Sequence, residues 1–592
     1  MSRSSTSSRS STSSRSMVRA LALVLACLLP LAACVRMPSS GPVVETEADG
    51  SLEERTGIFI DPKPPRAGAL PAEVVAGFLD AMTATPIQTT TAQEFLTRDA
   101  QAAWDPGERT ITYDEATQPR GSTTVRVRLR GAEYFDARGS HQGPLPADER
   151  RLALPMQRED GEWRIARVPD ALIVPESWFE QTFRRVSLYF FDPSARILVP
   201  EPVFVPAGDQ FATALTTSLL RGPGRALDGV SRTFIPSGLR FGLSVPVTED
   251  GVAELTLEGY AGQLSPQASE LMLAQLAWTL RQDPSIQALR VTLGGQQVTL
   301  PGGRTQVDVD EGSTYDPTGL QSSGLLFGLR EGLLVAGPAE GLGAVDGPFG
   351  TTEQGLRSVG VNLTGDRAAG VTTSGDRVLV AAVRGEEERV EQVASDGVDL
   401  LQPAWDFSDR IWLLDNRPGG AVVTHIGPRG PETLEVPGIT GRPVSAFLVS
   451  RDGSRLVAVV DRPDGDQIHV SRIVRDANGR VRSATPAERI AWEGESGLRI
   501  TDIAWSSPTS VAVLHRVAKE LFQVRTLSVD GAGSGIDDLL TTIPVRAEAL
   551  AGSPVTTEGL YVVTASSLFD PRSGTTGGLR LDPEVTSIGY PG

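Results

Sequence analysis

The sequence predicts a multidomain protein in which two α+β domains precede an all-β propeller. The chain has 592 residues, and a single hydrophobic core stops growing at roughly 250–300 residues, so several domains are expected. Two successive stretches combine apolar residues at helical spacing with strand-like alternation. The C-terminal part instead repeats short apolar strands separated by turn residues.

The chain opens with a stretch typical of a secretory signal. Four arginines and no acidic residue precede an apolar run at 20–33, which is shorter than the roughly 20 residues that a spanning helix needs. The run ends in Leu31-Ala32-Ala33-Cys34, which resembles the bacterial lipobox. We therefore predict that residues 1–33 are a lipoprotein signal peptide and that the thiol of Cys34 carries the lipid. The alternatives are an ordinary secretory signal cut after an A-x-A-like site and an uncleaved anchor. Cys27 is a weaker candidate because it lies inside the run, with no polar segment after it.

Residues 34–70 are predicted to form a flexible tether. They are rich in Pro, Ser, Gly and acidic residues and show little apolar periodicity, so they bury too little surface to offset the entropy of ordering. The Ser/Thr/Arg repeat ahead of Met17 adds nothing that a signal requires, and either Met1 or Met17 can be the start.

The charge of the chain excludes some partners. The net charge is −18, and removal of residues 1–33 makes it about −22, because they contain four arginines and no acid. This net negative charge argues against nucleic-acid binding, which depends on Lys and Arg neutralising phosphates. It also argues against contact of the protein surface with an anionic membrane, so the acyl group is the expected membrane contact. Lys63 and Lys519 are the only lysines, which indicates a high-GC actinobacterial genome. Neither follows a glycine, so no phosphate-binding Gly-Lys-Ser/Thr loop is present.

No pattern of residues indicates catalysis, a cofactor or a metal. After processing, Cys34 is the one cysteine left, and we expect the histidines, which lack metal-ligand spacing, to be surface or packing residues: His141, His425, His469 and His515. The glycine-rich stretch 531–535 reads as a loop. Two acidic clusters lack EF-hand spacing, and we expect no bound ion at either. They are Asp308, Asp310, Glu311 and Asp316, and Asp461, Asp464 and Asp466.

The first folded segment, residues 71–175, is predicted to place helices before an antiparallel sheet. PAEVVAGFLDAMTAT has apolar residues at helical spacing, Pro71 suits a first helical turn, and TAQEFLTRDAQAAW predicts a second helix. The period falls to two in TTVRVRLR, as in a half-buried strand. We expect Arg126, Arg128 and Arg130 to form a solvated outer face, with a ligand-binding face as the alternative.

The second folded segment, residues 184–302, is also α+β. Two strands, RVSLYFFD and ILVPEPVFVP, precede helices in DQFATALTTSLLRGP and SPQASELMLAQLAWTL. Ser265 is a good N-cap for the second helix, whose leucines form its buried stripe. IQALRVTLGGQQVTL predicts a hairpin across Gly294-Gly295.

The third segment, residues 318–592, is predicted to be a β-propeller. The strands DRVLVAAV, DRIWLLD, SRLVAVVD, TSVAVLH and EGLYVVTA recur at steps of 33, 45, 55 and 49 residues, near the roughly 40–50 residues of a propeller blade. QPAWDFS, VSAFLVS and ITDIAWS precede three of them and supply inner strands. Five to seven blades fit, six best. A pair of β-sandwiches is the alternative.

Several long stretches resemble known families. VSLYFFDPSARILVPEPVFVP, LLRGPGRAL and LMLAQLAWTL with IQALRVTLGG together resemble a GerMN domain of bacterial envelope and sporulation proteins. The order of elements in the first segment resembles an NTF2-like domain. With the lipobox and AEVVAGFLDAMTATP, the chain resembles the LpqB family of actinobacterial lipoproteins over essentially its whole mature length, propeller included.

The LpqB resemblance implies a non-enzymatic accessory protein on the outer face of the cytoplasmic membrane, facing the cell wall. Members work with the MtrA–MtrB two-component system by contacting the extracytoplasmic sensor region of the histidine kinase, in envelope homeostasis and division. The alternative is a propeller lipoprotein that binds wall polymer or a small ligand. An envelope hydrolase lacks a nucleophile or metal set.

The tryptophans bear on the alternative of a propeller that binds wall polymer, because sugar-binding surfaces favour exposed aromatic rings. Aromatic residues are 6% of the chain. Trp405 and Trp505 occupy matching strand positions beside small residues, so we expect both in the core. Trp412 is the better candidate for an exposed ring.

Replacing the predicted acylated residue tests the anchor. We expect Cys34→Ala to leave the precursor uncleaved or to release the protein from membranes, because the thiol is the acceptor of the lipid. Membrane fractionation and the mass of the mature N-terminus measure both effects. Unchanged processing and retention would show that the lipobox interpretation is wrong, and Cys27→Ala is the matched control.

Overall fold

The computed structural model describes residues 60–592, except 243, 260, 261, 263, 301, 386–388, 493, 534–537, 574–577 and 582–584. The predicted signal peptide, Cys27, Cys34 and most of the tether lie outside the described residues. Within the described ranges, no helix is long and apolar enough to cross a bilayer.

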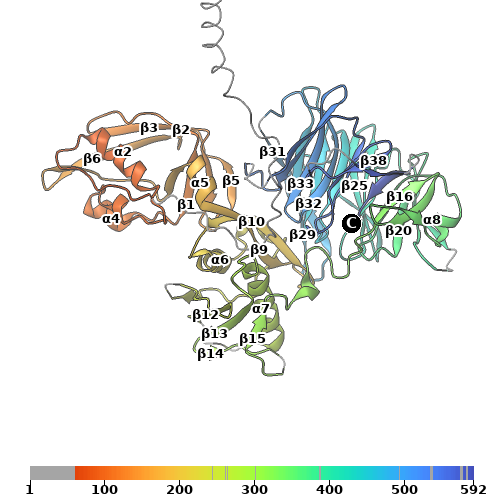
Figure 1. Ribbon diagram of the computed structural model, residues 1–592, viewed down its shortest axis with the longest axis horizontal. Coiled ribbons are helices and arrows are strands. Elements are labelled where there is room, and N and C mark those ends of the chain that lie inside the picture. Colours follow the sequence, from red (N-terminus) through yellow and green to blue (C-terminus); the bar gives the residue numbers. More distant parts are fainter. Residues whose placement is uncertain are drawn as a thin grey trace, which may run out of the picture. The chain divides into compact units, whose positions relative to one another are not determined.

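The N-terminal module places three helices before two four-stranded sheets (Figure 1). The helices are α2 (Pro71–Ala81), α3 (Thr90–Gln93) and α4 (Arg98–Ala103), and α5 (Glu176–Thr182) ends the module. One sheet has the order β5 (His141–Pro144), β4 (Glu133–Asp136), β1 (Arg109–Tyr113) and β8 (Leu172–Pro175). The other has the order β2 (Glu115–Ala116), β3 (Thr124–Arg130), β6 (Arg151–Glu159) and β7 (Glu162–Ile165).

Local signals explain these helices. Pro71 is the first residue of α2, and the Glu73 carboxylate accepts from the N–H of Leu70 at 2.8 Å, as in a capping box. The predicted second helix is wrong in one respect, because the stretch breaks into α3 and α4. Thr97 caps α4 by accepting from the N–H of Ala100 at 3.3 Å.

The sheets differ from the prediction in one pairing. All contacts are antiparallel except that of β1 with β8, which run parallel with Ile111 opposite Ile173. Parallel strands need a long crossover connection between them. The chain between β1 and β8 includes the whole second sheet and provides this connection. Arg126, Arg128 and Arg130 are exposed, as predicted. The NTF2-like assignment stays a prediction.

The GerMN module follows directly. It contains β9 (Phe183–Phe191), β10 (Leu198–Pro206), α6 (Phe211–Leu220), β11 (Arg240–Phe241), β12 (Val252–Glu258), α7 (Pro266–Leu280), β13 (Ala288–Leu293), β14 (Gln296–Gln297) and β15 (Gln306–Asp308). Short 3-10 turns lie at Arg225–Leu227 and Ser313–Tyr315. β9 and β10 form a long antiparallel hairpin, and α7 is the crossover between the parallel strands β12 and β13.

The capping and turn signals of this module are confirmed. The Ser265 hydroxyl accepts from the N–H of Ala268 at 3.2 Å and begins α7. The predicted leucine stripe of that helix is buried. Gly294 and Gly295 have φ values of 56° and 80° and join β13 to β14 in the predicted hairpin.

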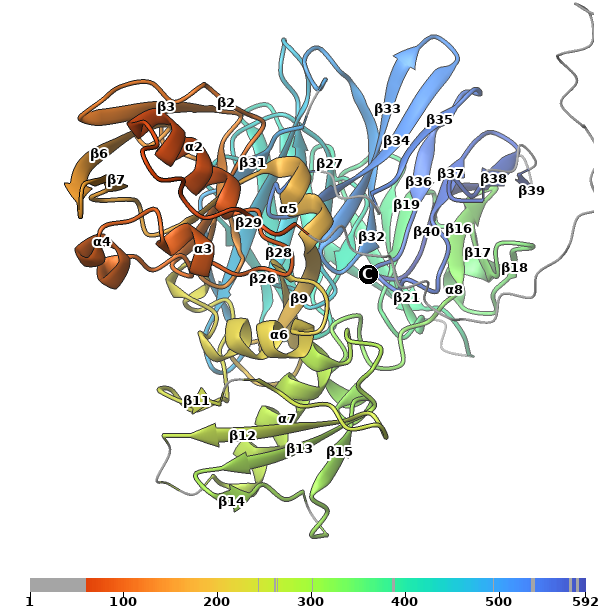
Figure 2. The same cartoon turned by 60° about the vertical axis from the view of Figure 1, so that its left-hand side comes forward.

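In the residues that the structure describes, the propeller has six sheets, five of four strands and one of five, and its blades are seen in Figure 2. Blade 1 is β40 (Val585–Gly589), β16 (Leu326–Arg330), β17 (Leu333–Gly337) and β18 (Gly343–Ala344); blade 2 is β19 (Leu356–Val361), β20 (Arg367–Thr372), β21 (Val378–Ala382) and β22 (Val390–Ala394). Blade 3 is β23 (Ala404–Trp405), β24 (Ile411–Arg417), β25 (Gly420–Gly427) and β26 (Gly430–Leu434). Blade 4 is β27 (Val444–Val449), β28 (Arg455–Val460), β29 (Gln467–Arg475) and β30 (Val481–Ala484), with β31 (Glu488–Ile490) also pairing β29. Blade 5 is β32 (Ile500–Ser507), β33 (Ser510–Ala518), β34 (Leu521–Ser528) and β35 (Leu540–Ile543); blade 6 is β36 (Ala549–Ala551), β37 (Tyr561–Val563), β38 (Ser567–Phe569) and β39 (Leu579–Arg580). The short helix α8 (Pro348–Thr351) links blades 1 and 2.

The first strand of each blade contacts that of the next, which closes the ring. The C-terminal strand β40 pairs antiparallel with β16 and completes blade 1. Indole groups tie neighbouring blades together: the Nε1 of Trp405 donates to the carbonyl of Gly360 at 3.0 Å, and that of Trp505 to Val449 at 3.1 Å. The six-bladed prediction and the core positions of both tryptophans are confirmed, and the β-sandwich alternative is wrong.

One carboxylate links the GerMN module to the propeller. Glu201 of β10 is buried and receives hydrogen bonds from Arg472 at 2.5 and 2.8 Å. Arg455, whose side chain is fully buried, donates to the same carboxylate at 2.9 Å and also to the carbonyl of Pro200. Both arginines belong to blade 4, so their hydrogen bonds to Glu201 tie β10 to β28 and β29.

A histidine links the N-terminal module to the propeller. The Nε2 of His141 lies 3.0 Å from Glu133 Oε2, and its Nδ1 lies 3.0 Å from the carbonyl oxygen of Asp530. Both partners are acceptors, so the arrangement suits an imidazolium that donates twice. Burial lowers the pKa of His141, but the bonds to Glu133 and Asp530 outweigh burial and raise it above its usual value.

Removing the Glu201 carboxylate is expected to destabilise the protein strongly. Glu201→Ala leaves the buried guanidinium group of Arg455 and the partly buried one of Arg472 without this carboxylate, which costs about 3–5 kcal/mol. The control Glu254→Ala removes the partner of Arg290 in a half-exposed ion pair, worth roughly 0–1 kcal/mol. Urea unfolding measures both variants. Equal shifts in their midpoints would contradict the role assigned to Glu201.

The His141 contact is expected to stabilise the protein more at acid than at alkaline pH. A histidine whose folded pKa is raised contributes stability that is fully present below its unfolded pKa of roughly 6.5 and is lost as pH rises through the folded value. The difference in urea midpoint between the wild type and His141→Gln should therefore be larger at about pH 5.5 than at about pH 9. A difference that does not change with pH would contradict this assignment.

Candidate functional site

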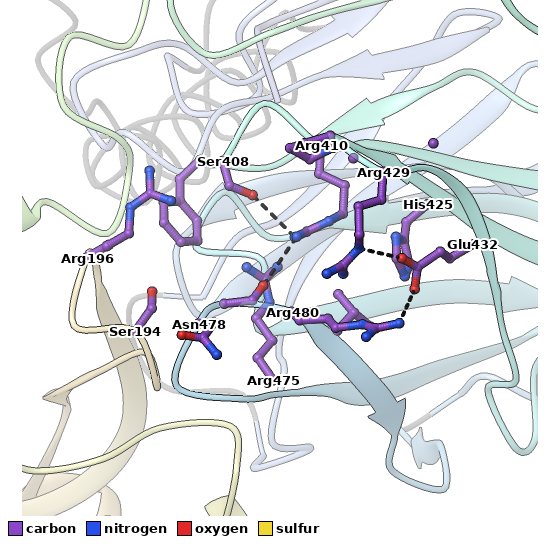
Figure 3. A pocket seen from close by; sticks show the side chains of 16 residues that line it. Ser194, Arg196, Ser408, Arg410, His425, Arg429, Glu432, Arg475, Asn478 and Arg480 are labelled. Carbon is purple, nitrogen blue, oxygen red and sulfur yellow. Dashed lines mark hydrogen bonds and ion pairs between the residues drawn. The ribbon is translucent and has the colours of Figure 1, made fainter.

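A cavity of about 230 Å³ lies between the GerMN module and blades 3 and 4 of the propeller (Figure 3). The turn between β9 and β10 contributes Ser194 and Arg196. Three propeller turns supply most of the remaining lining residues: Phe407, Ser408, Arg410, Pro428, Arg429, Asn478, Gly479 and Arg480. We call this cavity the arginine pocket, because five arginines line it.

The turn that joins β23 to β24 is shaped by its own first residue. The Asp406 carboxylate accepts from the N–H of Ser408 at 2.9 Å and from its hydroxyl at 2.5 Å. Asp409 adopts a φ of 54°, which its short polar side chain tolerates. The chain therefore reverses direction within this turn. The reversal brings the guanidinium group of Arg410, just before β24, against the Asp406 carboxylate.

Asp406 is fully buried and is paired by two guanidinium groups. Arg410 donates to its Oδ2 at 3.0 Å, Arg475 at 2.9 Å, and the indole of Trp412 at 3.0 Å. Burial alone would raise the pKa of Asp406, but the charges of Arg475 and Arg410 hold it well below the usual range. The carboxylate is therefore ionised, and it positions both arginines.

The exposed side of the pocket holds further charges. Glu432 accepts from Arg429 at 3.2 Å and from Arg480 at 3.4 Å (Figure 3). Arg196 lies over the ring of Phe407 at 5.3 Å, within the range of a cation–π contact.

His425 lines the pocket without adding to its charge. Burial, and then the positive charge of Arg410, lower the pKa of His425 to about 4. The imidazole is consequently neutral at physiological pH.

The chemistry of the pocket is that of binding. Arginine guanidinium groups stay protonated and present donors in a fixed planar fork. The hydroxyls of Ser194 and Ser408 donate to the carboxylates of Asp192 and Asp406 within their own turns. Across the described residues, no group of three His, Cys, Asp or Glu side chains could hold a metal ion.

The four histidines are all buried. His141 lies at the junction of the N-terminal module and the propeller, and the other three lie on β25, β29 and β33. His425 packs its ring 5.3 Å from that of Trp412. All four are therefore buried rather than surface residues, with His141 hydrogen-bonded across a module junction and His425 lining the arginine pocket.

The acidic clusters are divided among separate partners. Glu311 pairs with Arg304 at 2.5 Å and Asp310 with Arg281 at 3.3 Å. In the second cluster, Asp466 pairs with Arg499 at 2.6 Å and Asp461 accepts from the hydroxyl of Ser445 at 2.7 Å. The glycine-rich stretch lies in the connection between β34 and β35, of which 531–533 are described.

The prediction of an exposed ring at Trp412 is wrong. The side chain is fully buried, and its indole donates to Asp406. A propeller blade packs against a neighbour on each face, so a residue that points away from one side of its sheet still meets another blade. All of the first five residues of β24 are buried for that reason.

The sequence patterns described above do not identify Asp406, Arg410 or Arg475 as site residues. A local signal exists for the first two, because the turn after the inner strand reads NLTGDR in blade 2, DFSDR in blade 3 and SRDGSR in blade 4. Each of these turns ends in an arginine where the second strand begins. No comparable repeat marks Arg475.

Three family models match successive parts of the chain. The model "Lipoprotein LpqB, N-terminal domain" matches residues 64–180, "Sporulation and spore germination" (Germane) matches 187–299, and "Lipoprotein LpqB beta-propeller domain" matches 332–576. Their order is that of the N-terminal module, the GerMN module and the propeller.

Relatives align over nearly the whole chain. Lipoprotein LpqB of Thermobifida fusca is 26% identical over 92% of this chain and 92% of its own length. The proteins of that name from Cutibacterium acnes and Mycobacterium bovis (strain BCG / Pasteur 1173P2) are each 26% identical, over 89% and 92% of this chain and 92% and 94% of their own lengths. The crystal structure of TolB from Acinetobacter baumannii is 13% identical, covers 55% of this chain and 86% of its own, and has a TM-score of 0.32. The chain belongs to the LpqB family of lipoproteins.

Proposed function

We propose that this protein is a lipid-anchored accessory partner of a sensor histidine kinase of the MtrA–MtrB type, in cell-envelope homeostasis and division. It acts without catalysis on the outer face of the cytoplasmic membrane, facing the cell wall, and contacts the extracytoplasmic region of the kinase. Membership of a lipoprotein family supports the anchor, for which Cys34 is the proposed attachment. The family resemblance suggests the partner.

The way the modules attach to the propeller supports a particular docking face. In an antiparallel blade, successive turns alternate between the two ends of the strands. The turn between the first and second strands therefore lies on the same face as the turn between the third and fourth. We call this the junction face, and the face that carries the turns between second and third strands the opposite face.

The hydrogen bonds from the two α+β modules reach the junction face. Arg455 follows the first turn of blade 4 and bonds Glu201. Arg475, where the third strand of that blade ends, donates its N–H to the carbonyl of Gly229 at 2.7 Å. Asp530, which follows the third strand of blade 5, accepts from His141. The observation that carries the proposal is that both modules contact the junction face, which leaves the turns of the opposite face for a partner.

The opposite face offers exposed residues for docking. Ser374 of blade 2, Asp464 of blade 4 and Lys519 of blade 5 lie in turns between second and third strands and are exposed. Val517, beside the last of these turns, is 52% exposed.

Site-specific photocrosslinking in living cells tests the proposal. A photoreactive residue at Ser374, Asp464 or Lys519 is expected to capture the kinase, identified by mass spectrometry of the adduct. The matched control is Asp148, an exposed residue of the N-terminal module, which should capture it much less.

The outcomes separate the candidate functions. Capture of a sensor kinase from Asp148 alone would contradict the assigned face. Capture of wall glycan from the propeller positions, with no kinase, would favour the alternative of a wall-polymer-binding or small-ligand-binding lipoprotein. The burial of Trp412 removes the one ring proposed for such a sugar surface.

A further inference from the structure

The arginine pocket carries an excess of positive charge within an acidic protein. The whole chain has a net charge of −18, yet five guanidinium groups line this cavity: Arg196, Arg410, Arg429, Arg475 and Arg480. Their carboxylate partners are the buried Asp406 and Glu432. Three positive charges are therefore left without a carboxylate. Arg196, Arg429 and Arg480 are exposed or half-exposed and keep contact with water, but the buried Arg410 and Arg475 share the single charge of Asp406, so one buried positive charge is uncompensated, which is costly.

The buried arginines have donors to spare. Arg475 is 4% exposed, and its Nε and Nη1 have no hydrogen-bond partner, although its Nη2 donates to Asp406. Arg410 is 8% exposed, and its Nε likewise has no partner. A buried donor without an acceptor costs about 1–3 kcal/mol. Both residues line the arginine pocket.

The ring of Phe407 contacts an arginine from each of the two modules. Arg196 reaches the pocket from the GerMN module, where its guanidinium group lies over the ring of Phe407. Arg475 lies 5.5 Å from the centre of the same ring. The aromatic ring thus positions two guanidinium groups, one from the GerMN turn and one from the propeller, beside the same cavity.

The direction of the donors distinguishes between anions. They come from four different connections, one in the GerMN module and three in the propeller (Figure 3). Donors that converge from several sides suit a tetrahedral oxyanion with several acceptor oxygens, whereas one planar fork suffices for a carboxylate. The excess of three charges also matches a group that carries more than one negative charge.

We propose that the arginine pocket binds a phosphate group, held by Arg196 of the GerMN module and by Arg410, Arg475 and Arg480 of the propeller. The ligand is a phosphate ester or free phosphate, and its binding bridges the two modules. This inference does not depend on the kinase partnership, because it concerns a small anion on the junction face. Failure of either proposal leaves the other standing.

Titration calorimetry of the purified full-length lipoprotein in neutral detergent tests the site. The probes are inorganic phosphate, glycerol 3-phosphate and a glycerophosphodiester. Arg196→Gln and Arg480→Gln each remove an exposed or half-exposed guanidinium group, so both variants should fold. Each is expected to weaken binding roughly tenfold, as loss of one charge-assisted hydrogen bond does.

Two controls make the result specific. Arg128→Gln removes an exposed arginine of β3 in the N-terminal module and should leave binding unchanged. Sulfate should compete with phosphate, because it has the same tetrahedral shape, and succinate should not. Circular dichroism shows that each variant retains its fold.

Each outcome bears on the proposal. Tighter binding of the glycerophosphodiester would identify a lipid or polymer phosphate as the source, and tighter binding of inorganic phosphate would identify the free anion; both support the site. No binding to the wild type, or equal binding to wild type, Arg196→Gln and Arg480→Gln, would overturn it. Tighter, arginine-dependent binding of succinate would overturn the assignment to phosphate.

Discussion

The relative position of the GerMN module and the propeller depends on the buried carboxylate of Glu201. A carboxylate removed from water must be paired and hydrogen-bonded, or its desolvation is not offset. Arg455 and Arg472 provide that pairing only when β10 lies against β28 and β29. Arg455 is itself fully buried and would be an under-compensated cation without Glu201. Each charge therefore requires the other, and the two modules are held in one register.

The same requirement shapes the neighbouring pocket. Asp406 is buried and ionised because Arg410 and Arg475 surround it, and each guanidinium group keeps at least one free donor. The GerMN turn then adds Arg196 beside the propeller arginines. The excess of positive charge thus belongs to the assembled junction. A protein with an acidic surface can in this way hold an anion site that its composition does not suggest.

Local patterns predicted the fold well and the pocket poorly. The Ser265 cap, the Gly294-Gly295 hairpin and the blade spacing are encoded by neighbouring residues, so periodicity and turn chemistry reveal them. The pocket brings together residues from Arg196 to Arg480, and nothing local distinguishes a buried arginine from an exposed one such as Arg128. The exposed ring predicted at Trp412 is wrong because both faces of its blade are covered by neighbouring blades, so the first five residues of β24 are all buried.

Hydrogen–deuterium exchange of the full-length protein, with and without inorganic phosphate, tests the central claim most directly. If buried charge pairs join the modules around an anion site, phosphate should slow exchange on both sides of the junction, in residues 192–197 of the GerMN turn and in 406–410 and 476–480 of the propeller. That protection should disappear in Arg196→Gln. Protection of the propeller turns alone, or of neither side, would contradict the account.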